Sequence, residues 1–199
     1  LLMNPKARGA LDLTRESPAT RARYGHSQFG QTALLARRLV EAEVPYIQLN
    51  YSRDVDAFNP GYEIGWDTHI YNFELLQDQL CPTFDRAFTA LLDDLYDRGL
   101  IDQTLVVCKG EFGRTPFAQG GSQGRDHNEH AFSMWLAGGD VKGGMAYGAT
   151  DEWGYRTIEN KLEVHDLHAT ILHLLGMDHT LLTYRFGGRD FRLTDIYGN

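Results

Sequence analysis

Six side chains that are able to bind a metal ion occur in three short stretches of this sequence. The stretches are WDTH, the glutamate after TLVVCKG, and GRDHNEH, and the six residues are Asp67, His69, Glu111, Asp126, His127 and His130. Carboxylate oxygens and imidazole nitrogens together suit Zn, Mn or Fe better than Ca, which prefers oxygen ligands alone. This mixture predicts a divalent transition-metal site of the kind that hydrolases use.

Each stretch also has an interpretation without a metal ion. A D-x-H pair such as Asp67 and His69 often arises by chance, and Glu111 could form an ion pair with Arg114 instead. The HNEH stretch could place His130 beside His127 in one pocket, or it could be a solvated loop. Residue types and spacing alone leave both interpretations open.

The hydrophobic pattern predicts the elements that would position these residues. Helices are expected from Ser27 to Val40, over residues 70–80, and from Pro82 to a C-terminal cap at Gly99. Strands are expected over residues 44–51 and 104–108, and the second is an apolar run typical of a central strand buried on both faces. This alternation predicts an α/β fold with a mostly parallel central sheet flanked by helices, and such sheets place ligands at the carboxyl ends of their strands.

The second half of the chain carries weaker signals. Loops should dominate residues 113–154 because glycine is frequent there, with one strand inside AFSMWLAGG. A helix is expected over residues 164–176, with Asp166 as N-cap and Gly176 at its end. The tail after residue 182 reads as irregular.

Composition restricts the classes of function. The chain has 199 residues, of which 42% are hydrophobic and 23% charged, which is typical of a soluble globular domain. A net charge of -8 argues against binding of the nucleic-acid backbone. No apolar run approaches the roughly 18 residues of a membrane span. Two cysteines provide neither a disulfide framework nor a CxxC metal motif.

Longer motifs add a resemblance to a known family. In chain order they are EFGRTP, GRDHN, WLAGGDVKGGMAYGATDEWG, DLHATILHLLG and LTYRFGGRDFRLTDI. From about Ser27 onward the chain resembles an uncharacterised sulfatase-like family of exported bacterial proteins in the alkaline-phosphatase superfamily. The resemblance implies one domain over residues 1–199, with an irregular lead-in over residues 1–26, that forms the C-terminal part of the full domain. It also implies a parallel sheet with a metal centre at its strand ends, and export to the periplasm or cell surface.

The resemblance further implies roles for individual residues. Asp67 and His69 would bind one metal ion, Glu111 would replace an aspartate ligand, and His127 would be the last histidine ligand. Asp126 would orient a histidine ring, and Arg114 would hold the oxygens of a phosphate or sulfate. Two departures from the superfamily pattern stand out, because the D-x-H spacing is short and no histidine follows Glu111.

Two functions are compatible with these expectations. The first is a Zn- or Mn-dependent hydrolase of phosphate or sulfate esters, or the C-terminal part of one that lacks its nucleophile, since the superfamily's nucleophile motif is not found in this chain. The second is a non-catalytic exported protein that retains the fold and one metal ion and uses its Gly-rich loops to hold a glycan or a partner protein. The ligand expected in either case is a small anionic ester or a sulfated or phosphorylated glycan.

Overall fold

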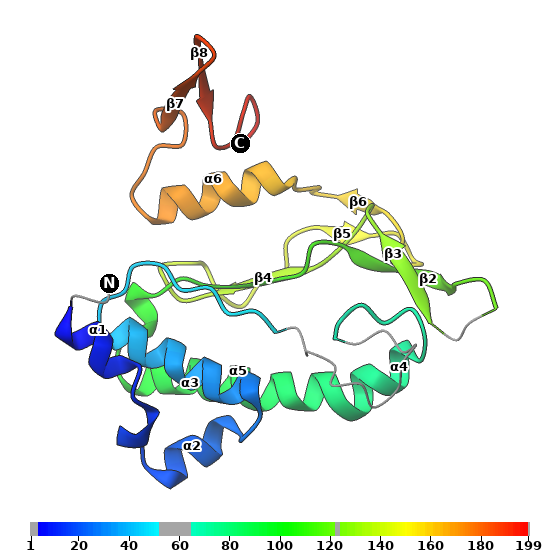
Figure 1. Ribbon diagram of the computed structural model, residues 1–199. Helices are drawn as coiled ribbons and strands as arrows, with labels where there is room; N and C mark the ends of the chain where they lie inside the picture. Colours follow the sequence, from blue (N-terminus) through cyan, green and yellow to red (C-terminus); the bar gives the residue numbers. More distant parts are fainter. Residues whose placement is uncertain (1–3, 52–64, 122–123, 199) are drawn as a thin grey trace. The chain divides into compact units, whose positions relative to one another are not determined.

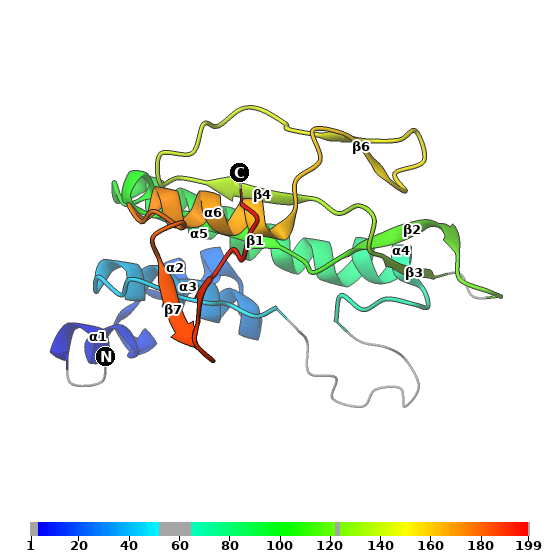
Figure 2. The same ribbon diagram turned by 90° about the horizontal axis from the view of Figure 1, so that it is seen from above.

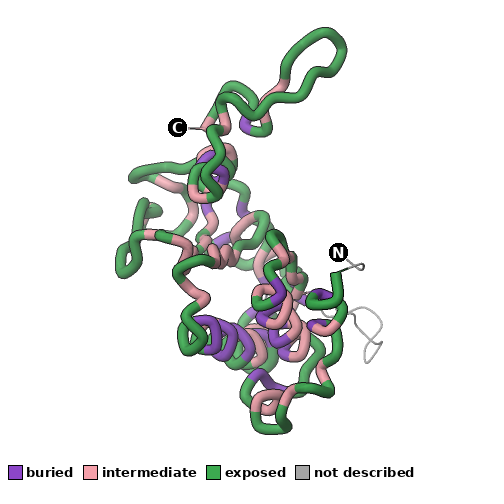
Figure 3. Tube along the Cα trace, turned by 90° about the vertical axis from the view of Figure 1, so that its left-hand side faces the viewer, coloured by how far each residue is buried: buried purple, intermediate pink, exposed green. Residues whose placement is uncertain are grey.

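The computed structural model describes residues 4–51, 65–121 and 124–198, which form two compact units (Figure 1). The first unit consists of Leu1–Thr104 and Arg114–His127, and the second of Leu105–Gly113 and Asn128–Asn199. Most buried hydrophobic side chains belong to the helices of the first unit (Figure 3).

The first unit begins with short helices where an irregular lead-in was expected. They are α1 (Pro5–Ala10), the 3₁₀ turn η1 (Leu13–Arg15) and α2 (Pro18–Tyr24). Asn4 and Ser17 cap α1 and α2 by accepting from backbone N–H groups, and each helix has a proline in its first turn. The lead-in prediction was therefore wrong, although these caps and prolines are recognisable in the sequence.

Helix α3 (Gln28–Glu41) confirms the helix predicted after Ser27, whose hydroxyl accepts from the N–H of Gly30 at 3.1 Å. α3 packs along α5 (Figures 1 and 2). A Cβ atom on Gly30 would lie 2.2 Å from the carbonyl oxygen of Tyr24. Glycine therefore lets the first turn of α3 approach the end of α2.

A long helical segment follows the candidate ligands Asp67 and His69. It consists of α4 (Asn72–Leu75), the π-helical η2 (Leu76–Leu80) and α5 (Cys81–Asp97), and a 3₁₀ turn, η3 (Ile101–Gln103), comes after it. The predicted C-terminal cap of the helix at Gly99 is confirmed, because Gly99 has φ 67° and its N–H donates to Tyr96 O at 2.9 Å. The strand predicted over residues 44–51 was wrong, since its described residues pair with no other described strand.

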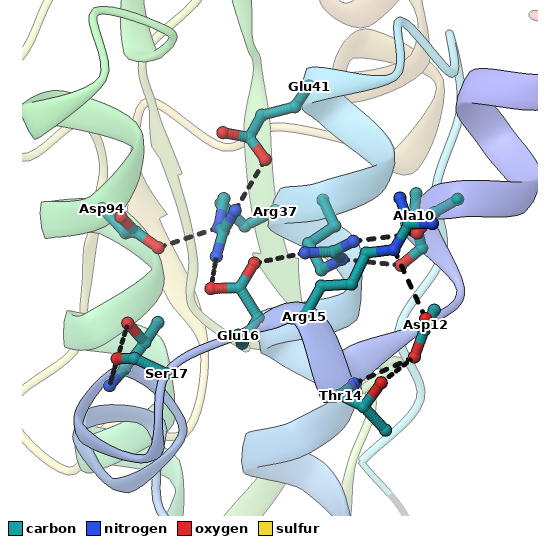
Figure 4. A network of polar contacts seen from close by, with 12 residues as sticks. Ala10, Asp12, Thr14, Arg15, Glu16, Ser17, Arg37, Glu41 and Asp94 are labelled. Carbon is teal, nitrogen blue, oxygen red and sulfur yellow. Dashed lines mark hydrogen bonds and ion pairs between the residues drawn. The ribbon is translucent and has the colours of Figure 1, made fainter.

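A buried arginine joins the helices of the first unit (Figure 4). Arg37, 1% exposed, lies 2.9 Å from Glu16, 2.6 Å from Glu41 and 2.9 Å from Asp94. The two 2.9 Å contacts are ion pairs that lack hydrogen-bond alignment. The hydroxyl of Tyr24 also donates to Asp94 at 2.8 Å. These contacts connect α2, α3 and α5 through charge as well as apolar packing.

Acid should destabilise this network. Burial alone would raise the pKa values of Glu16 and Asp94, but Arg37, Arg38 and Arg98 outweigh it and hold both pKa values below their ordinary range. The unfolded chain then binds more protons below about pH 4.3, so the free energy of unfolding should fall as the pH drops through these values. Urea unfolding between about pH 5 and pH 3 measures this dependence. The Asp94→Asn variant should show less of it, and a pH-independent wild-type protein would contradict the prediction.

The strands form two-stranded sheets and no parallel central sheet within the described residues. The pairs are β1 (Val106–Lys109) with β4 (Met134–Ala137), β2 (Gly113–Ala118) with β3 (Arg125–Asn128), β5 (Ala149–Thr150) with β6 (Thr157–Glu159), and β7 (Thr183–Phe186) with β8 (Arg189–Arg192). The predicted α/β fold with a mostly parallel sheet was therefore wrong. The apolar run Val106–Cys108 pairs antiparallel with Leu136 and its neighbours, and an apolar run does not fix the direction of its partner.

Two other predictions for the second unit need correction. Helix α6 (Val164–Leu174) is capped by Glu163, while Asp166 accepts from the N–H of Glu163 at 2.8 Å as the other half of a capping box. The tail expected to be irregular forms the β7–β8 hairpin. Gly187 and Gly188 have φ values of 57° and 82°, which suit a two-residue hairpin turn.

Candidate metal site

Asp67 and His69 lie in the segment that precedes α4. Between them, Thr68 is 1% exposed and donates its hydroxyl to Asn72, which is also buried. Thr68 is thus buried, whereas the flanking side chains of Asp67 and His69 meet each other at 2.9 Å. The D-x-H spacing thus presents both candidate ligands together.

The β2–β3 hairpin supplies the remaining groups of the site. At its end the N–H of Gln119 donates to Gly124 O at 3.3 Å. Along the strands the N–H of Asp126 donates to Thr115 Oγ1 at 3.1 Å. These bonds hold the backbone that leads into His127, which is part of β3.

Gly124 allows the hairpin to lie against the segment that carries His69. A Cβ atom on Gly124 would lie 1.6 Å from the carbonyl oxygen of His69 and 2.0 Å from its carbonyl carbon. No side chain fits at such distances, so the approach of these two backbones requires glycine.

Three potential ligand atoms meet where these segments touch. His69 Nε2 lies 2.9 Å from His127 Nε2 and 2.9 Å from Asp67 Oδ1, and His127 Nε2 lies 2.7 Å from Asp67 Oδ1. The side chain of His69 is 15% exposed, whereas those of Asp67 and His127 are 58% and 39% exposed. We call this set of three residues the triangle.

Asp67 is ionised in this arrangement. The hydrogen bond from His127, together with one from Arg114, lowers the pKa of Asp67 to about 2. Arg114 Nη2 lies 2.9 Å from Asp67 Oδ1 and donates to Trp66 O at 2.7 Å, and Nη1 donates to Arg125 O at 3.2 Å. Arg114 therefore holds the carboxylate in place while placing a positive charge beside it.

The donor set fits a transition-metal ion. Two imidazole nitrogens and one carboxylate oxygen form the ligand set of several catalytic Zn and Fe sites, which keep open coordination positions. Ligand atoms around tetrahedral Zn are about 3.3 Å apart, given bonds of about 2.0–2.1 Å. To bind such an ion, the three ligand atoms would have to move apart by about half an ångström. Small rotations of the side chains provide this movement.

Comparison with known proteins shows the family. A family described as "Protein of unknown function (DUF1501)" matches residues 1–199. The chain belongs to this family. No sulfatase or alkaline-phosphatase family matches, so the resemblance proposed from the motifs is not supported and is withdrawn. No curated protein and no solved structure matches this DUF1501 chain.

The other predicted site residues of the DUF1501 chain have different positions. Asp126 Oδ1 accepts from the N–H of His127 at 2.8 Å and lies 3.7 Å from His69 Nδ1. Glu111 is exposed after β1, in the second unit. His130 is in the same unit, where its N–H donates to Asn128 Oδ1 at 3.1 Å. Metal binding by Glu111 and His130 stays a prediction.

Three contributors to the site were missed in the sequence. Thr68 positions the D-x-H segment, Gly124 permits its approach, and Gln119 Oε1 lies 2.7 Å from His69 Nδ1. The glycine directly before RDH could have indicated a close backbone approach, whereas nothing in the sequence indicates Gln119. Within the described residues of the DUF1501 chain, no helix is long and apolar enough to cross a membrane.

Proposed function

We propose that this protein binds one divalent ion, Zn or Mn, through Asp67, His69 and His127 and hydrolyses phosphate or sulfate esters. The observation that supports this proposal is the convergence of two Nε2 atoms and one ionised carboxylate oxygen within 2.9 Å. A bound ion would lower the pKa of a coordinated water and stabilise charge on the ester oxygens.

The charges around the triangle support an anionic substrate. Asp67 contributes one negative charge to the ligand set, so a divalent ion there would retain one positive charge. The guanidinium of Arg114, 2.9 Å from Asp67, adds a second positive charge whose position is fixed by two backbone carbonyl groups. Fixed positive charge stabilises the negative charge that develops when a phosphate or sulfate ester is attacked.

The exposure of the triangle supports a second function, binding without catalysis. Asp67 is 58% exposed and His127 39% exposed, whereas catalytic sites commonly exclude water during reaction. An open ion with anion affinity would suit a surface that holds a sulfated or phosphorylated glycan. Export, expected from the withdrawn resemblance, remains part of this second proposal, and fractionation of cells that produce the protein tests it.

Metal analysis and turnover assays test the proposal together. The purified protein should contain close to one Zn or Mn per chain. His127→Ala removes a ligand and should weaken metal binding strongly. Loss of a residue that only orients a ligand typically weakens binding by about 10–100-fold, and the loss in His127→Ala should be larger. His173→Ala, which removes an exposed histidine of α6, serves as control and should bind metal normally. The metal-loaded protein should hydrolyse an aryl phosphate or aryl sulfate, and His127→Ala should not.

The outcomes separate the two functions. Bound metal with turnover supports the hydrolase, and bound metal without turnover of either ester favours the binding protein. A wild-type protein that retains no metal and takes none up from added Zn or Mn would overturn both.

A further inference from the structure

The ring of His69 has a defined partner on the side away from the triangle. Its Nδ1 atom lies 2.7 Å from Gln119 Oε1, and an amide oxygen only accepts hydrogen bonds. With the amide oxygen facing the ring, the proton of this contact lies on Nδ1 of His69. In a neutral imidazole the other nitrogen, Nε2, then carries a lone pair.

The backbone of Gln119 is held in the hairpin that carries His127. Its N–H donates to Gly124 O, and Gly124 in turn touches the backbone of His69. One end of the hairpin thus fixes both the position of the His69 backbone and the acceptor for its ring. This arrangement limits the rotation of the His69 ring that would exchange the positions of Nδ1 and Nε2.

We infer that Gln119 is a positioning residue that selects the Nδ1–H tautomer of His69 and so presents the Nε2 lone pair to a metal ion. Its role for a bound ion rests on the proposed function, but its effect on the tautomer does not. Asp126 also lies near the Nδ1 side of this ring. It is 3.7 Å from Nδ1, beyond hydrogen-bond distance, and its Oδ1 accepts from the N–H of His127.

This tautomer has a consequence for the triangle. With the proton on Nδ1, the lone pair of His69 Nε2 approaches the ionised Oδ1 of Asp67 at 2.9 Å. Two acceptors at this distance repel each other unless a proton or a cation lies between them. His127 Nε2, 2.9 Å and 2.7 Å from the two atoms, is placed to supply one proton to both. A divalent ion would replace that single proton.

The side-chain amide of Gln119 is also uncharged, and this affects the net charge of the site when it holds an ion. A carboxylate at 2.7 Å from His69 would cancel the positive charge that the ion and Asp67 leave. An amide orients the ring without this cancellation. Gln119 therefore combines a fixed tautomer with attraction for an anionic ester, in agreement with the proposed substrate class.

Nitrogen-15 NMR of the metal-free protein tests the inference directly. Two-bond proton-nitrogen spectra at about pH 8, where ordinary imidazoles are neutral, report which ring nitrogen of His69 carries the proton. Wild type should show protonated Nδ1. Gln119→Leu should show a mixture or the Nε2–H tautomer, whereas Gln119→Glu, which keeps an acceptor, should retain the wild-type tautomer. Asp126→Asn is the matched control and should leave the tautomer unchanged.

Titration with Zn²⁺ then measures the effect on binding. Gln119→Leu should weaken Zn²⁺ binding by about 10–100-fold, and Gln119→Glu should restore it. An Nδ1–H tautomer that persists in Gln119→Leu would overturn the inference, whatever the metal does. A tautomer change in a protein whose wild type binds no Zn²⁺ would support the inference and overturn the proposed function alone.

Discussion

Gly124→Ala should separate the two halves of the candidate site. The new Cβ would lie 1.6 Å from His69 O and 2.0 Å from the carbonyl carbon, and backbone atoms cannot yield as a flexible side chain can. We expect the segment with Asp67 and His69 to move away from β3, with a loss of about 1–3 kcal/mol in the free energy of unfolding. Proton NMR contacts between the His69 and His127 rings, together with urea unfolding, measure both effects.

The control for this variant is Gly120→Ala in the same hairpin. Among the described residues, a Cβ atom at position 120 would meet nothing within 4 Å, so the effect on stability should stay within about 0.5 kcal/mol. If Gly124→Ala kept the contact between the two rings and wild-type stability, the close approach described here would be wrong.

Arg37→Leu should strongly destabilise the first unit. The side chain is 1% exposed, and its removal leaves Glu16 and Asp94, 10% and 7% exposed, without their shared counter-charge. Breaking a buried ion pair from one side costs about 3–5 kcal/mol. Because Arg38 still pairs with Glu16 and Arg98 with Asp94, we expect a loss near the lower end of this range. Urea unfolding followed by far-ultraviolet circular dichroism measures the loss.

Arg23→Leu provides the comparison. Arg23 contacts Asp93 at 3.3 Å and Asp97 at 3.4 Å, but its side chain is 41% exposed and its partners more so. Exposed ion pairs contribute about 0–1 kcal/mol, so this variant should remain close to wild type. Equal losses in the two variants would show that burial of Arg37 does not determine its effect.

The helices were predictable because their signals are local. Ser27 caps α3 as its sequence position indicates, and the apolar stripe of α5 ends at Gly99 as expected. Strand pairing was not predictable in the same way. The run Val106–Cys108 reads as a buried parallel strand, yet its partner is the antiparallel Met134–Ala137. The identity of a partner strand depends on contacts far along the chain.

The candidate site also combines features that local sequence signals indicate with features that depend on distant contacts. Residue type and the D-x-H spacing identified Asp67, His69 and His127, which the structure brings together. The contact of Gln119 with His69 joins residues 50 positions apart, and no local pattern encodes it. Arg114 was expected to hold a substrate anion, whereas its described contacts are to Asp67 and backbone carbonyls. Its direct contact with a substrate stays a prediction.

The separation of the ligands along the chain has a consequence for how the protein would respond to its ion. His69 and His127 are 58 positions apart, so their nitrogens meet only after the hairpin and the segment before α4 have docked. An unfolded chain offers no such triangle, and an ion that binds only the docked form shifts the equilibrium toward it by mass action. If the proposed ion binds, its supply would then influence the lifetime of the protein against proteases, and so its abundance, in addition to the proposed activity.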